Sequence, residues 1–119
     1  YDLGYNTQEV FLQDWQRLDE ASLTRLKVCC GLKADKAKDV LDSVKDIVVP
    51  WDIAWDVFLN VKVPRYYERA RTAFPGLENL PLNAQGALVS LVFNRGASME
   101  DKPGGLTRVH MRNIRDIVP

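Results

Sequence analysis

The sequence has few cysteines, one histidine, no surplus charge and no long apolar run. Its two cysteines, Cys29 and Cys30, are neighbours, and a bridge between adjacent residues strains the peptide, so no disulfide framework is expected. With only His110 to join them and no Cys-x-x-Cys spacing, the sequence predicts no metal site and no cofactor. Apolar runs such as Ile47 to Val49 are far shorter than the roughly 20 residues of a membrane span, so none is expected.

Charge is balanced over the whole chain but unevenly distributed along it. Residues 1–60 carry eleven acidic and seven basic side chains, whereas residues 61–119 carry five acidic and nine basic ones. A basic half can attract an anionic polymer such as nucleic acid or a bacterial wall. The excess is small beside that of a nucleic-acid-binding domain, so no nucleic-acid partner is expected.

Helix start and stop signals follow one another along the chain. Apolar residues make up 46% of the 119 residues, which is typical of a globular domain. Apolar spacing, capping residues and Gly or Pro stops predict helices over residues 6–15, 19–30, 34–45, 51–74, 82–95 and 107–117. Pro64 is expected to kink or restart the fourth of these. The sequence therefore predicts a single, mainly α domain over residues 1–119.

The segment from Leu82 to Phe93 is almost continuously apolar. A helix that is apolar most of the way round belongs in the middle of a domain. We therefore expect a buried central helix over about residues 82–95, with Leu88 and Phe93 inside it.

This helix resembles the buried central helix of phage-type lysozymes (muramidases), through the run Gln-Gly-Ala-Leu-Val-Ser-Leu-Val-Phe-Asn-Arg-Gly at residues 85–96. Motifs before it keep the family's order and rough spacing: Pro64-x-Tyr66, Phe74-Pro75-Gly76 and Leu80-Pro81. The opening Tyr1-Asp2-Leu3-Gly4-Tyr5 is similar to the segment after the family's glycine-rich hairpin. The resemblance covers about residues 51–96 and the first five; residues 6–50 match only as helices.

The resemblance implies a lysozyme-like helical lobe and action on the β-1,4 glycan strands of peptidoglycan at the bacterial cell wall. Such cleavage needs a carboxylic acid of raised pKa and a second carboxylate. In the family the general-acid Glu, and the Asp and Thr that position water, would precede Tyr1. The chain is therefore expected to be an incomplete or inactive form of a longer domain, without cofactor. The alternative is a non-catalytic peptidoglycan-binding or protein-interaction domain. Self-association through uncovered apolar surface is also expected if the hairpin lobe is absent.

Several polar residues are candidates for the site that the resemblance implies. Asp2 is a weak catalytic candidate, or a turn former that bonds its own backbone. Tyr5, Asn94 and Arg95 are candidate substrate-binding residues. Asn94 either bonds an N-acetyl group or caps the helix end, and Arg95 either meets a wall carboxylate or complements the helix dipole. Glu100-Asp101 either borders the cleft or is a solvated acidic pair.

Aromatic residues at helical spacing leave two interpretations open. They are either sugar-stacking positions or core side chains. The residues concerned are Trp51, Trp55, Phe58, Tyr66, Tyr67, Phe74 and Phe93.

Overall fold

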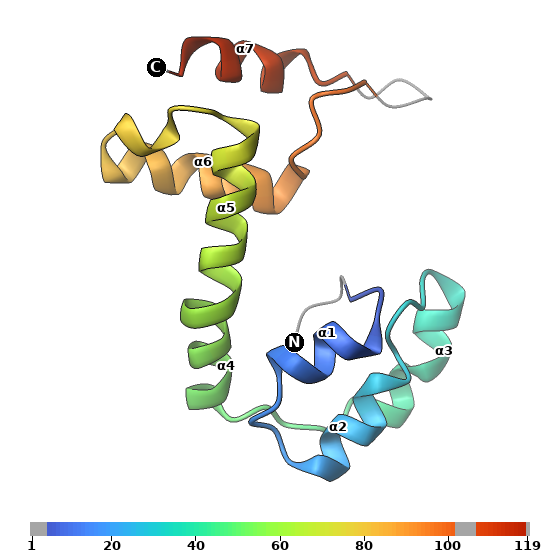
Figure 1. Ribbon diagram of the computed structural model, residues 1–119. Helices are drawn as coiled ribbons and strands as arrows, with labels where there is room; N and C mark the ends of the chain where they lie inside the picture. Colours follow the sequence, from blue (N-terminus) through green and yellow to red (C-terminus); the bar gives the residue numbers. More distant parts are fainter. Residues whose placement is uncertain (1–4, 102–106, 119) are drawn as a thin grey trace. The chain divides into compact units, whose positions relative to one another are not determined.

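The computed structural model describes residues 5–101 and 107–118, which are mainly helical and contain no β-strand. This confirms the predicted fold class. The chain divides into two compact units, Tyr1–Val61 and Lys62–Pro119, each with its own hydrophobic core. The ribbon in Figure 1 follows the helices of each unit in sequence order. The expectation of one domain over residues 1–119 stays a prediction. None of the helices in the described ranges is long and apolar enough to cross a membrane.

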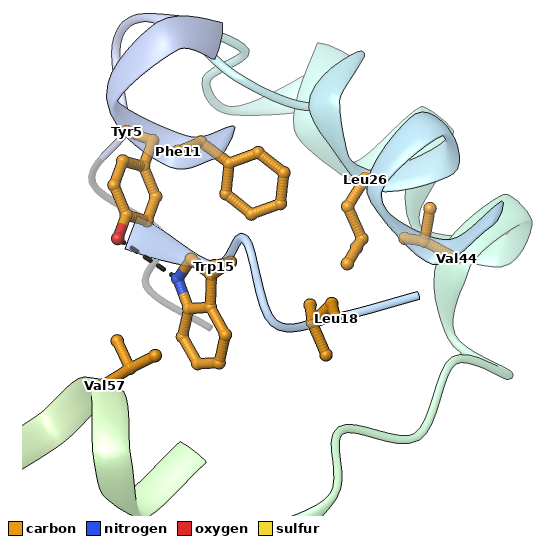
Figure 2. Close-up of a cluster of buried hydrophobic side chains, with 7 residues drawn as sticks. All are labelled: Tyr5, Phe11, Trp15, Leu18, Leu26, Val44 and Val57. Atoms are coloured by element: carbon orange, nitrogen blue, oxygen red, sulfur yellow. Dashed lines mark hydrogen bonds between the residues drawn. The ribbon is translucent and has the colours of Figure 1, made fainter. Parts of the chain in front are cut away.

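Unit 1 contains α1 (Gln8–Asp14), α2 (Glu20–Lys27), α3 (Asp35–Val44) and α4 (Trp51–Val57). Asp19 caps the N-terminus of α2, because its side chain accepts a hydrogen bond from the Ser22 backbone N–H at 2.9 Å. Pro50 directly precedes α4, where a missing N–H costs no hydrogen bond. The hydrophobic core of unit 1 consists of Tyr5, Phe11, Trp15, Leu18, Leu26, Val44 and Val57 (Figure 2).

A π-helical turn, η1 (Phe58–Lys62), follows α4 along the chain and leads into α5 (Val63–Ala73). The sequence predicts a break here, because Pro64 has no N–H and its ring crowds the preceding turn. The structure confirms the break as a change from α- to π-helical hydrogen bonding just before Pro64.

Unit 2 continues with a 3₁₀ turn, η2 (Leu77–Asn79), then α6 (Leu82–Arg95) and α7 (Val109–Ile117). Gly76 and Gly96 have φ values of +96° and +79°, so both turns use backbone that glycine adopts readily. α5 packs against α6 and η2. The core of this unit consists of Ala70, Ala73, Phe74, Leu77, Val92 and Met111.

α6 has the predicted bounds but is not enclosed on all sides. Val92 is its only fully buried residue; Leu88 is half-buried and Phe93 is 59% exposed. The expectation of a buried central helix is therefore not met. The reason is one of size, because a unit of roughly 60 residues has too little chain to surround a helix. Within unit 2 one face of α6 is covered and the other faces solvent.

Candidate functional site

Tyr5, a predicted substrate-binding residue, lies in the core of unit 1. Its hydroxyl donates a hydrogen bond to Asp14 Oδ2 at 2.6 Å and accepts one from Trp15 Nε1 at 3.1 Å, the bond drawn in Figure 2. Its ring meets the ring of Phe11 edge-on, with 5.4 Å between centroids. This geometry makes Tyr5 part of a buried network, and its contact with a glycan stays a prediction. Asp2 lies outside the described residues.

Asp14 is a buried carboxylate that the sequence analysis missed. A buried charge is costly unless it is hydrogen-bonded, and the Tyr5 hydroxyl supplies such a bond. The residues around Asp14 in the sequence indicate that it is buried. Asp14 follows the buried Phe11 by three residues in α1, and the buried Trp15 and Leu18 come directly after the helix, so apolar residues surround Asp14 in the sequence.

Asn94 and Arg95 lie at the exposed C-terminal end of α6, in unit 2. The Asn94 side-chain amide donates to the Ser90 carbonyl oxygen at 2.8 Å, one turn earlier. The Arg95 carbonyl oxygen accepts a hydrogen bond from Arg108 Nη1 at 2.6 Å. The bond from Arg108 thus satisfies a carbonyl of the last turn, whereas the Asn94 amide bonds a carbonyl inside the helix, so both roles considered for Asn94 stay predictions. Both residues remain at the surface, and their contacts with a glycan stay predictions.

Asp101, of the acidic pair Glu100-Asp101, holds the start of the last helix. Its Oδ1 accepts the Arg108 backbone N–H at 2.7 Å and Arg112 Nη1 at 3.0 Å. The hydrogen bond from the Arg108 backbone and then that from the Arg112 side chain hold the pKa of Asp101 below its usual range. A glycosidase acid needs a shift in the opposite direction. The geometry therefore gives Asp101 a structural role.

Asp19 and Asp46 also have a pKa below the usual range, as Asp101 does. The Ser22 backbone N–H lowers the pKa of Asp19, and a hydrogen bond from the Arg25 side chain lowers the pKa of Asp46. All three carboxylates are stabilised in the charged form, which does not donate a proton to a leaving oxygen. Among the described residues, moreover, no group of three or more His, Cys, Asp or Glu side chains is placed to hold a metal ion.

Three aromatic side chains form an exposed row along α4 and the start of η1; we call Trp51, Trp55 and Phe58 the aromatic ladder. Ring centroids are 5.9 Å apart between Trp51 and Trp55, at 22° between planes, and 5.6 Å apart between Trp55 and Phe58, at 28°. The three side chains are 76%, 47% and 49% exposed, in that order along the chain. The structure thus places these aromatics at the surface, whereas it buries Phe74 completely.

Polar side chains accompany the aromatic ladder along α4. Arg17 pairs with Asp52 at 3.6 Å and with Asp56 at 3.3 Å. Asn60 donates its side-chain amide to Asp56 Oδ1 at 2.8 Å. These polar groups are therefore paired with one another, and the ladder itself is an apolar surface.

Comparison with known proteins gives no match: no family model matches this chain, and no curated protein or solved structure matches it significantly. A function for this chain is therefore argued from its residues and their geometry.

Proposed function

We propose that this chain is a muramidase-like protein that acts on bacterial peptidoglycan, and that its described part binds the β-1,4 glycan strands without cleaving them. The aromatic ladder carries the proposal. Its three large side chains are exposed together along α4 and the start of η1, where contact with water does not stabilise them. Exposed apolar surface of this kind marks a binding site.

The chemistry of the ladder suits a glycan. Each pyranose ring has faces made largely of C–H bonds, which pack on flat aromatic side chains, and a rim of hydroxyl and amide groups. Trp51 and Trp55 supply the flat surfaces and an indole N–H each. Asp56 and Asn60, further along α4 and in η1, are hydrogen-bonded to each other. The choice of peptidoglycan among glycans comes from the resemblance to phage-type lysozymes in residues 51–96.

Binding without cleavage is favoured by the carboxylates. Hydrolysis of a glycosidic bond needs a proton donor of raised pKa and a second carboxylate. Hydrogen bonds lower the pKa of Asp19, Asp46 and Asp101 instead. The resemblance, for its part, places the catalytic Glu before Tyr1. Both arguments support a binding role for the described part.

Co-sedimentation with purified bacterial walls, followed beside a turbidity assay for lysis, tests the proposal. We expect the chain to pellet with walls, to be released by soluble chitohexaose but not by cellohexaose, and to leave turbidity unchanged. The double variant W51A/W55A should lose at least about tenfold in wall affinity, as buried tryptophans at binding sites do. Val48→Ala is the matched control, because Val48 is an exposed apolar residue of the same unit outside the ladder.

Each result has one meaning. Failure to pellet would overturn the proposal. A fall in turbidity would show that the chain hydrolyses the wall and does not only bind it. Equal pelleting of W51A/W55A and wild type would remove the aromatic ladder from the binding surface.

A further inference from the structure

Unit 1 contains an apolar pocket of about 410 Å³ that is distinct from the aromatic ladder. Phe11 lines it from α1, Leu26 from α2 and Val44 from α3; Figure 2 shows these three side chains. Its volume lies in the range of about 300–1,000 Å³ that small-molecule sites occupy. Leu41 on the apolar side of α3 also lines the pocket, yet 55% of it stays exposed, so unit 1 does not fill this space itself.

One charged side chain, Lys33, joins the apolar lining among the residues that the structure describes. None of the ion pairs found between described residues includes Lys33. The next residue, Ala34, also lines the pocket and has a φ of +51°, a conformation that residues with a Cβ rarely adopt. The lining therefore combines an apolar cavity with one cation.

The cysteine pair forms part of the same wall. Cys29 and Cys30 are both half-buried and both line the pocket. Burial raises the pKa of the Cys30 thiol, and the neighbouring Cys29 adds to this shift. A thiol that stays protonated is a weak nucleophile and packs like a small apolar side chain. This wall therefore favours a ligand that is held without a covalent bond.

We propose that the pocket binds a free aliphatic carboxylate, with its hydrocarbon chain among the side chains of α1, α2 and α3 and its carboxylate paired with Lys33. The chain portion matches the apolar lining, and the carboxylate matches the one cation of that lining. The site does not depend on glycan binding, since no residue of the aromatic ladder lines it.

Octanoate is a suitable probe, and the two thiols report on its position. Alkylation of Cys29 and Cys30 by N-ethylmaleimide is measured at constant pH with increasing octanoate, alongside calorimetric titration. We expect octanoate to slow alkylation in a saturable way and octan-1-ol, which lacks the charge, to protect more weakly. Lys33→Glu should weaken octanoate binding about tenfold, the loss of one charge-assisted hydrogen bond, whereas Lys33→Arg should retain binding.

Lys38→Glu is the matched control, because Lys38 is an exposed lysine of α3 that does not line the pocket. Its affinity for octanoate should equal that of the wild type. Circular dichroism confirms that each variant is folded. Absence of protection, protection by octan-1-ol equal to that by octanoate, or equal losses in Lys33→Glu and Lys38→Glu would each overturn the proposal.

Discussion

The two units use their large side chains in opposite ways. Unit 2 buries Phe74 and Leu77 completely against Ala70 and Val92, so its core is closely packed. Unit 1 places a hydrogen-bonded pair, Tyr5 and Asp14, inside its core, leaves an apolar pocket there and exposes two of its three tryptophans. Unit 2 also has a pocket, of about 520 Å³, with Arg69, Met99 and Arg115 in its lining, whereas residues of the hydrophobic core itself, Phe11, Leu26 and Val44, line the pocket of unit 1. Both of the proposed binding sites lie in unit 1.

The strongest test of this comparison is Phe74→Ala. Phe74 is fully buried in unit 2, so its truncation should lower the free energy of unfolding by about 3–5 kcal/mol. Urea denaturation followed by circular dichroism measures this change. Phe93→Ala is the control, since Phe93 lies in the same unit but is 59% exposed; it should cost about 1 kcal/mol or less.

Tryptophan fluorescence distinguishes the unfolding of unit 1 from that of unit 2 in the same urea denaturation. Trp15, Trp51 and Trp55 all belong to unit 1, so tryptophan fluorescence reports on unit 1 while circular dichroism reports on both. In Phe74→Ala the dichroism should change at lower urea than the fluorescence does. If Phe93→Ala lowered the free energy of unfolding as much as Phe74→Ala does, Phe93 would be buried, and the enclosed α6 expected from the sequence would be correct.

The buried polar pair of unit 1 is the next test. In Asp14→Ala the Tyr5 hydroxyl loses its acceptor inside the core, and an unsatisfied buried group costs about 1–3 kcal/mol. Asp14→Asn, which keeps an acceptor oxygen of the same size, should cost less. Both free energies come from urea denaturation followed by tryptophan fluorescence, which reports on unit 1 and includes Trp15, the donor to the same hydroxyl. Equal stability of all three proteins would show that the pair does not contribute to the core of unit 1.

Gly→Ala substitutions in the two units should change stability in opposite directions, by less than the core substitutions do. Gly31 in unit 1 has a φ of +80°, and an added Cβ would lie 3.4 Å from the Asn6 carbonyl oxygen, so Gly31→Ala should cost about 1–2 kcal/mol. Gly86 lies within α6, where an added Cβ would meet nothing within 4 Å, so Gly86→Ala should stabilise unit 2 by about 0.5–1 kcal/mol. Thermal unfolding measures both. Destabilisation by Gly86→Ala would mean that α6 is covered on that side.

The fold class and the local features of the helices were predicted from the sequence, whereas the burial and exposure of particular side chains were not. The start of the second helix, the break at Pro64 and the stop at Gly96 depend on a few adjacent residues, and the structure confirms each of them. The exposure of Phe93 and of the aromatic ladder, and the burial of Asp14, depend on which helices cover which face. Helical spacing identifies such a face but does not say what packs on it.

Charge gives the smallest expected effect, and it allows the two units to be compared again. The pKa of Asp101 is lowered in the folded state, so the stabilisation is present at neutral pH and is lost as the pH falls through that lowered value. Acidification should therefore loosen α7, seen as a decrease in the thermal midpoint of unit 2. Asp101→Asn keeps an acceptor for the Arg108 N–H but does not titrate, so this part of the pH dependence should disappear; Glu100→Gln should leave it unchanged. Asp46, paired with Arg25, gives unit 1 a dependence of the same sign. Solvent screens both groups, which keeps the effect small beside that of core truncation.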